Sequence, residues 1–260
     1  MLVYRSSTKS LASTLHLVAR EADRTWVAGE EFPYSQSQVR RAGDRLRLAF
    51  ERGEPFADDD RSLLNLYRSW HQPTLERCQR NLVSLFHNAL ELNPEEVYIT
   101  GRPLKTVDAI VAKISRNRTR LNRMQDIAGT RIVVPTLRFQ EIATDVVLTM
   151  FEEQEGHVAK DTREDGDDYG YRAIHVVATL DQRFAEIQIR TVTQDAWAQI
   201  VEQTDKSLGS DLKHGQGPAD WIEWLLELSD AFRQRDLGKP SVIPPTPHDR
   251  LIESQEESTE

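Results

Sequence analysis

The sequence predicts an α+β protein in which a mixed β-sheet with flanking helices follows a helical N-terminal region. Three patterns support this prediction. Apolar residues recur at helical spacing up to about residue 90. From Glu95 onward, short apolar runs alternate with amphipathic stretches, as expected for strands and helices that pack on one another. Residues 168–175 and 186–191 each alternate apolar with polar side chains, which is typical of strands with one buried face.

The first 92 residues carry several helix start signals. Residues 10–28 have helical spacing, and Ser35-Gln-Ser-Gln38 resembles a capping box ahead of a helix over 39–50. Asp58-Asp-Asp60 predicts the start of another helix, and Pro73 the start of the next. We expect the apolar residues of this region to pack helices together and assign them no chemistry.

The second part of the chain predicts the sheet and its helices. The expected strands cover 97–100, 131–134 and 157–160 in addition to the two runs above, and the expected helices cover 105–118, 137–152, 193–206 and a last one that Pro218 opens. Trp221, Trp224, Leu225 and Leu228 share one face of that last helix. We therefore divide the chain into a helical region (1–92), a core (93–210), a C-terminal helix (211–237) and a disordered acidic tail (238–260).

Composition narrows the class of protein. Hydrophobic residues make up 38% and charged residues 29% of the 260, and the sequence has no apolar run near the roughly 20 residues that span a bilayer. Cys78 is the single cysteine, so an internal disulfide is excluded and a cytoplasmic location is expected. The net charge of -9 argues against general nucleic-acid coating, yet Arg102 to Arg131 holds eight Lys or Arg against two acids. Such a basic island suits a small polyanion such as ATP, or a focused RNA contact, as well as a solvated helix face.

Two carboxylates and a set of cations predict a phosphate-handling site. Asp126 directly precedes a buried strand, where a carboxylate suits Mg²⁺ together with phosphate oxygens. Glu186, on a later strand, could be a second metal ligand or the base for an attacking hydroxyl. Four cations near the helix over 105–118 could clamp a triphosphate, namely Arg102, Lys105, Lys113 and Arg116. The sequence lacks a Walker-type glycine loop, which disfavours a P-loop enzyme.

The two alternating strands supply further polar side chains. On the first, the exposed face is expected to carry Tyr171, Arg172 or Ala173, and His175. On the second it is expected to carry Glu186, Gln188 and Arg190. An aromatic ring, an imidazole, an amide and a guanidinium on adjacent strands suit nucleotide binding.

These motifs resemble the synthetase domain of the RelA/SpoT family of alarmone synthetases. The resemblance runs from about Tyr98 to Thr191 and depends on the order of its motifs: Arg102 and Lys105 ahead of Lys113, Asp126-Ile-Ala-Gly-Thr-Arg131, Gly170-Tyr-Arg-Ala-Ile-His175 and Glu186-Ile-Gln-Ile-Arg-Thr191. It implies a nucleotidyltransferase-like sheet and a Mg²⁺-dependent GTP or GDP pyrophosphokinase that transfers pyrophosphate from ATP to a nucleotide 3′-hydroxyl.

The resemblance also implies a role for each site residue. Asp126 and Glu186 would be the catalytic and metal-binding carboxylates, and Arg102, Lys105, Lys113 and Arg116 would bind ATP. Tyr171 would stack on the acceptor base, and Arg172, His175 and Gln188 would also bind the acceptor. The implied partners are ATP and GDP or GTP, with no membrane; a second copy of the chain or a neutralising protein is also considered.

The acceptor stays open between alternatives. The family usually has Lys-Asp-Tyr-Ile-x-x-Pro-Lys at the acceptor loop, where this chain has Lys160-Asp-Thr-Arg-Glu-Asp-Gly-Asp167. An acid in place of the last Lys allows a toxin-type enzyme that modifies the 3′ end of tRNA as an alternative to an enzyme that uses free GDP or GTP. A catalytically inactive nucleotide-binding module is the third hypothesis.

Overall fold

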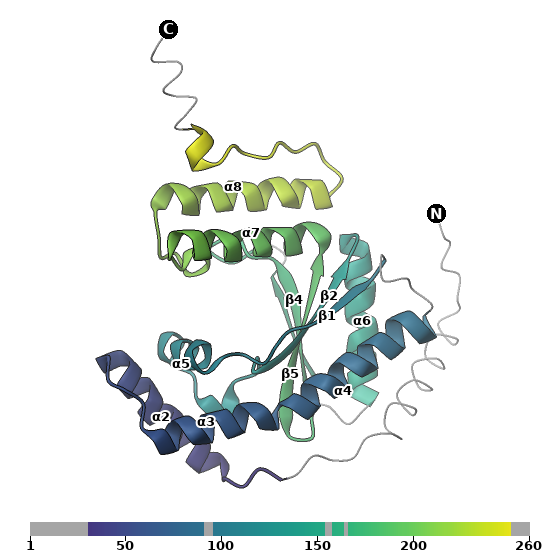
Figure 1. Cartoon of the computed structure of the whole chain (residues 1–260). Helices are drawn as coiled ribbons and strands as arrows, with labels where there is room; N and C mark the ends of the chain where they lie inside the picture. The colour runs from purple at the N-terminus through teal and green to yellow at the C-terminus, as the bar shows by residue number, and fades with distance from the viewer. Residues whose placement is uncertain (1–30, 91–95, 154–157, 164–165, 251–260) are drawn as a thin grey trace. The chain divides into compact units, whose positions relative to one another are not determined.

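A computed structural model of the chain describes residues 31–90, 96–153, 158–163 and 166–250 (Figure 1). The predicted helix over 10–28 and residues 251–260 of the predicted tail lie outside these residues. The chain forms two compact units. The first consists of Met1–Ile132, Asp145–Lys160 and His175–Gln188, and the second of Val133–Thr144, Asp161–Ile174 and Ile189–Glu260. The predicted domain boundaries remain predictions.

Five strands form one mixed sheet in the order β1-β2-β5-β4-β3, which confirms the predicted α+β fold class. The strands are β1 (Tyr98–Gly101), β2 (Ala128–Val134), β3 (Val158–Arg163), β4 (Ala173–Leu180) and β5 (Arg183–Thr191). Strands β4 and β5 are joined by Asp181 and Gln182, whose φ angles of 49° and 62° are both positive. A two-residue turn of this kind matches the twist of a hairpin, so it fixes the register of the two motif-bearing strands.

The first unit contains most of the helices. These are α2 (Gln36–Arg52), α3 (Asp58–Trp70), α4 (Gln72–Val83), the π-helix η1 (Ser84–Ala89), α5 (Val107–Arg116) and the 3-10 helix η2 (Leu121–Arg123). The predicted capping box is confirmed, because Ser35 and Gln38 cap each other's backbone at the start of α2. The predicted helix start at Lys105 is wrong. Helix α5 begins at Val107 because the Thr106 hydroxyl accepts a hydrogen bond from Ala109 N at 3.3 Å.

One hydrophobic core joins these helices to the start of β2. It contains buried residues of α2, α3 and α5 together with Leu121, Met124 and Ile127. Each side chain of this size contributes about 1.5–3 kcal/mol when fully buried. Since Ile127 is 1% exposed, the core holds the backbone next to Asp126 in place.

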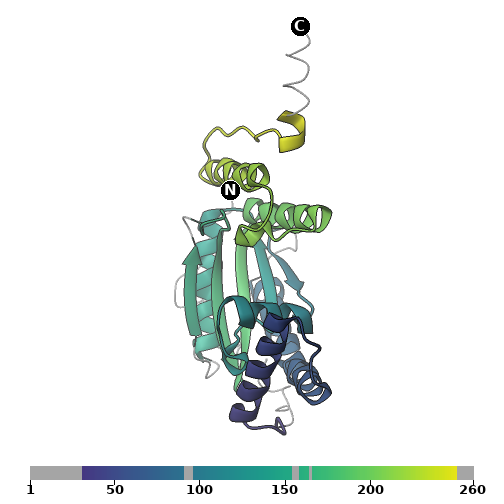
Figure 2. The ribbon, with the colours of Figure 1, turned by 90° about the vertical axis from the view of Figure 1, so that its left-hand side faces the viewer.

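The second unit is built around α7 (Val192–Leu208) and α8 (Ala219–Asp236), which lie side by side in Figures 1 and 2, with the 3-10 helix η3 (Leu212–His214) between them in sequence. Helix α6 (Leu137–Glu153) has residues in both units. The predicted apolar face of α8 is confirmed: Trp224, Leu225 and Leu228 are buried in one cluster with Trp197, and Trp221 packs at its border. Trp197 Nε1 also donates to Leu225 O at 2.8 Å.

The segment that follows α8 is described as far as Arg250. The sequence predicts disorder from residue 238 onward, but Trp224 Nε1 donates to Pro244 O at 3.1 Å. Across the ranges that the structure describes, we find no helix with the length and apolar character that a bilayer crossing requires.

Candidate active site

Asp126 is the centre of a cationic cluster in the first unit. Its carboxylate lies two residues before β2 and is 9% exposed. Lys113 Nζ, from α5, lies 2.6 Å from Asp126 Oδ2, and Lys105 Nζ lies 3.1 Å from the same oxygen. The other oxygen, Oδ1, is buried and has no hydrogen-bond partner in the described part of the chain. One carboxylate oxygen is therefore shared by two ammonium groups, while its neighbour is left for a further ligand.

Glu186, on β5 of the same unit, has several partners of its own. Its side chain is 12% exposed, with Oε1 at 2.8 Å from His175 Nδ1 and Oε2 at 3.8 Å from an Arg102 terminal nitrogen. Gln188 Nε2 donates to Glu186 Oε2 at 2.9 Å, and Gln188 Oε1 is buried with no partner among the described residues. The structure thus brings together four of the predicted site residues, namely His175, Glu186, Gln188 and Arg102.

The surroundings of Glu186 keep it ionised. Burial by itself raises the pKa of Glu186. The hydrogen bond and charge of His175, together with the charges of Lys113 and Arg102, lower it by more than burial raises it, so the pKa is about 2. Lys113 therefore acts on both carboxylates, by direct contact with Asp126 and through its field at Glu186. Arg116, the fourth predicted cation, is exposed at the end of α5.

The backbone between β1 and α5 positions two of the cations. Arg102 N donates to Gly129 O at 3.3 Å, and Lys105 N donates to Ile127 O at 3.1 Å. Both acceptors flank or belong to the start of β2, so the segment 102–105 runs along the residues that carry Asp126. The side chains of Arg102 and Lys105 then reach Glu186 and Asp126 respectively.

The oxygen atoms of Asp126 and Glu186 differ in how well they suit Mg²⁺. Within the ranges described, no group of three or more His, Cys, Asp or Glu residues forms a metal cluster. Mg²⁺ takes few protein carboxylates and draws its other ligands from water and phosphate, so a buried carboxylate oxygen without a partner suits it. Asp126 Oδ1 meets this requirement. Glu186 meets it less well, because His175 and Gln188 already occupy one oxygen each.

Tyr171 belongs to the second unit and lies before β4, not on it as predicted. Arg190 stacks over its ring, with the guanidinium carbon 5.0 Å from the ring centroid, and donates to the phenol oxygen at 2.9 Å. Arg190 also pairs with Asp195 at 3.0 Å. The alternating pattern predicts Arg190 on the polar face of this strand but assigns it no role, and Asp195 has no signal of this kind in the sequence.

The predicted exposure of the polar strand face is wrong for several residues. Gln188 is 6%, Arg190 is 4%, Arg172 is 8% and Ala173 is 2% exposed. The alternating pattern correctly separates the two faces of a strand, but the polar face is covered because its side chains pair with other polar groups, as Arg190 does with Asp195.

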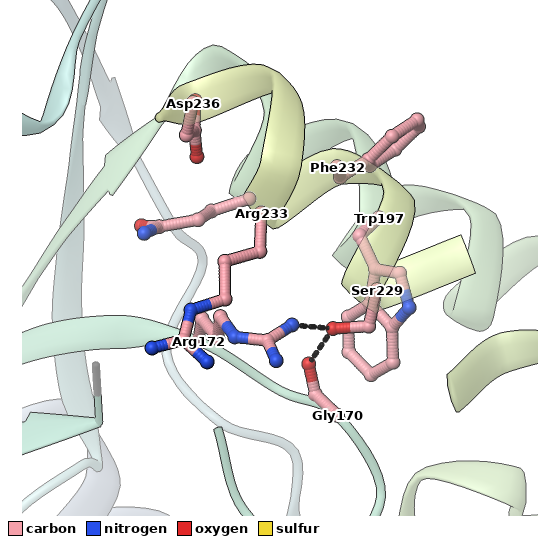
Figure 3. Close-up of a pocket in the computed structure, with 8 residues that line it drawn as sticks. Gly170, Arg172, Trp197, Ser229, Phe232, Arg233 and Asp236 are labelled. Atoms are coloured by element: carbon pink, nitrogen blue, oxygen red, sulfur yellow. Dashed lines mark hydrogen bonds between the residues drawn. The ribbon is translucent and has the colours of Figure 1, made fainter. Parts of the chain in front are cut away.

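Arg172 connects to α8 (Figure 3). It donates to Ser229 Oγ and, at 2.9 Å, to Asp230 Oδ1, while Ser229 Oγ donates to Gly170 O. Gly170 has a φ of 88°, and a Cβ there would lie 2.9 Å from Ser229 Cβ. Glycine is therefore required where this loop meets α8. The acceptor-binding role of Arg172 stays a prediction.

The part of the chain that contains these motifs is similar to known proteins. Residues 101–205 match the sequence model of a region found in RelA and SpoT proteins. We call this stretch the RelA/SpoT region, because it is similar to that part of those proteins. Uncharacterized proteins of Mycobacterium tuberculosis and Mycobacterium bovis are 30% identical to the chain over 189 residues, which cover 72% of this chain and 64% of theirs.

Solved structures share the fold. Small alarmone synthetase 1 of Bacillus subtilis, bound to its product pppGpp, superposes with a TM-score of 0.52 at 23% identity, covering 65% of this chain and 90% of that one. A GTP pyrophosphokinase family protein of Streptococcus pneumoniae gives a TM-score of 0.51 at 22% identity, covering 64% and 85%. The predicted RelA/SpoT resemblance is confirmed. The RelA/SpoT region contains every predicted site residue, and the individual roles remain predictions.

Proposed function

We propose that the chain transfers pyrophosphate from ATP to the 3′-hydroxyl of GDP or GTP and so makes (p)ppGpp-type alarmones. The observation that carries this proposal is the Asp126 carboxylate, which lies within a RelA/SpoT region with one oxygen on two lysines and the other buried without a partner. The fold likeness to an alarmone synthetase bound to pppGpp supports the same reaction.

In this proposal the cations bind the donor. Lys105, Lys113 and Arg102 hold the ATP phosphates and offset the negative charge that develops on the departing AMP. Arg116, exposed near Lys113 on α5, would extend the cationic surface. Asp126 would hold Mg²⁺ through its unpartnered oxygen, and the ion when bound would neutralise phosphate charge and align the reacting groups.

Glu186 and its partners would act on the acceptor. The 3′-oxygen attacks the β-phosphorus of ATP, the bond from that phosphorus to the α-phosphate oxygen breaks, and the hydroxyl proton leaves to a base. Glu186 is ionised and can orient the hydroxyl or accept this proton, assisted by His175. Gln188 Oε1 has no partner among the described residues, and so could accept a hydrogen bond from the bound nucleotide. Tyr171 would stack on the nucleobase of the acceptor, and Arg172 would also bind the acceptor.

The test uses purified protein, Mg²⁺ and ATP labelled on the terminal phosphate, with GDP, GTP, AMP or bulk tRNA offered in turn. The proposal expects label on GDP or GTP and one AMP for each labelled product. Formation of ADP in place of AMP would show simple phosphate transfer and contradict the proposal. Label found on tRNA alone would support the toxin-type alternative, and its appearance on no acceptor would support a binding module.

A further inference from the structure

We propose that Arg68, on helix α3, is a positioning residue for the donor-nucleotide site, because it fixes the segment that presents Lys105. This inference rests on the proposed function. Arg68 Nε donates to Lys105 O at 2.6 Å, across 37 residues of sequence. The helical N-terminal region thereby reaches the cationic cluster.

The geometry makes Arg68 the third anchor of a short segment. Between β1 and α5 the backbone N–H groups of Arg102 and Lys105 donate to Gly129 O and Ile127 O. Those two bonds hold one side of the segment, and Arg68 holds the Lys105 carbonyl. A charged donor at 2.6 Å makes a stronger bond than a neutral one. Without it the Lys105 peptide could rotate, and Lys105 Nζ would lose its fixed distance from Asp126.

Arg68 is itself held by the core of the first unit. Its neighbour Tyr67 is 3% exposed and packs in the cluster that also contains Ile110 of α5 and Ile127 beside Asp126. The backbone of Arg68 is therefore fixed relative to both the helix that carries Lys113 and the residue that follows Asp126. A rigid base of this kind is what a positioning residue needs.

Arg68 also lines an open hollow of about 460 Å³ together with Arg102. Gln72 and Gln79 contribute the other polar side chains, and none of the described residues that line the hollow is acidic. A hollow lined by two arginines and, among its described lining residues, by no acid favours an anionic ligand. The hollow thus adds a second reason why loss of Arg68 should weaken the binding of an anionic ligand.

The experiment measures both binding and turnover in the full chain. The probe is an ATP analogue with a methylene group between the α- and β-phosphates, which cannot donate pyrophosphate. Arg68→Met should weaken analogue binding about tenfold, as expected for loss of a charge-assisted hydrogen bond. It should raise the KM for ATP in proportion while leaving the acceptor KM unchanged. Arg68→Lys, which keeps a cationic donor, should restore part of the affinity. The matched control is Arg61→Met, an exposed residue of the same helix, which should bind the analogue like the wild type.

Equal analogue affinity in Arg68→Met and the wild type would overturn the inference. So would equal increases in both KM values with no recovery in Arg68→Lys, because that pattern indicates a structural role. If the wild type binds the analogue, Arg68→Met weakens it and no acceptor is labelled, the inference holds and the proposed reaction fails. A wild type that does not bind the analogue would overturn both.

Discussion

Replacing Glu186 with Gln tests the electrostatics of the site directly. The variant keeps the shape of the side chain and removes the charge that His175, Lys113 and Arg102 stabilise. The pKa of Glu186 falls from its ordinary 4.5 to about 2 in the folded protein. Since each unit of pKa corresponds to about 1.4 kcal/mol, the ionised carboxylate adds about 3 kcal/mol to the free energy of unfolding. The free energy of unfolding of Glu186→Gln should therefore be lower than that of the wild type by about this amount at neutral pH.

The sign of the pH dependence follows from the lowered pKa. A carboxyl group whose pKa is depressed by folding stabilises the protein above its unfolded pKa, and this contribution disappears as pH falls through the folded value. The stability gap between wild type and Glu186→Gln should therefore shrink as the pH falls from about 4.5 to about 2. Denaturant unfolding followed by tryptophan fluorescence measures it, because the chain has five Trp residues.

A matched control separates this effect from the general loss of one negative charge. Glu223 is an exposed residue of α8, and Glu223→Gln should change the free energy of unfolding by less than about 0.5 kcal/mol. Equal stability of Glu186→Gln and wild type at neutral pH would refute the electrostatic account. A gap that persists unchanged at the acid end of the range would also refute it, because it would then not depend on ionisation of Glu186.

Three further predictions concern the site and its support. Asp126→Asn keeps the fold but should lower kcat/KM at least about a hundredfold, because the carboxylate that would hold the metal is lost; near-normal turnover would show that the assignment is wrong. Tyr171→Ala should raise the KM for the acceptor, whereas Tyr171→Phe, which keeps the ring, should not; an unchanged KM in the alanine variant rejects stacking. Gly170→Ala should lower the free energy of unfolding by about 1–3 kcal/mol, since a Cβ would lie 2.9 Å from Ser229 Cβ at a φ of 88°; unfolding at the wild-type denaturant concentration would contradict this.

The sequence predicted which residues form the site better than it predicted which of their side chains contact one another. Asp126, Glu186 and the cations were identified because carboxylates next to buried strands and cations near one helix are local patterns. Which cation meets which carboxylate depends on packing between distant segments, so the sharing of Asp126 Oδ2 by two lysines could not be read from spacing. The spacing places Lys105 inside a helix, but one hydrogen bond at the Thr106 cap starts the helix at Val107. Spacing alone does not reveal such a bond.

The strand residues show a different kind of error. Period-two alternation correctly places Gln188 and Arg190 on the face opposite Ile187 and Ile189, but it cannot tell whether that face meets water. Arg190 is 4% exposed because Tyr171 and Asp195 surround its guanidinium. Arg68 was missed for a related reason: a polar residue on an amphipathic helix carries no local sign that its partner is a backbone carbonyl 37 residues away.

The charge arrangement of the cluster is consistent with the proposal that an acidic chain binds a polyphosphate. The whole chain carries a formal charge of -9, yet Arg102, Lys105 and Lys113 face two carboxylates, so the site itself has an excess of positive charge before His175 is counted. Two of these cations share one oxygen of Asp126, which leaves each with donors to spare. A triphosphate offers both lysines additional anionic oxygens at short range, and their movement towards it would uncover Asp126. In the proposed function the same cations would neutralise the buried acid before the donor binds and would then bind the donor, so removal of the Asp126 carboxylate should disturb nucleotide binding as well as turnover.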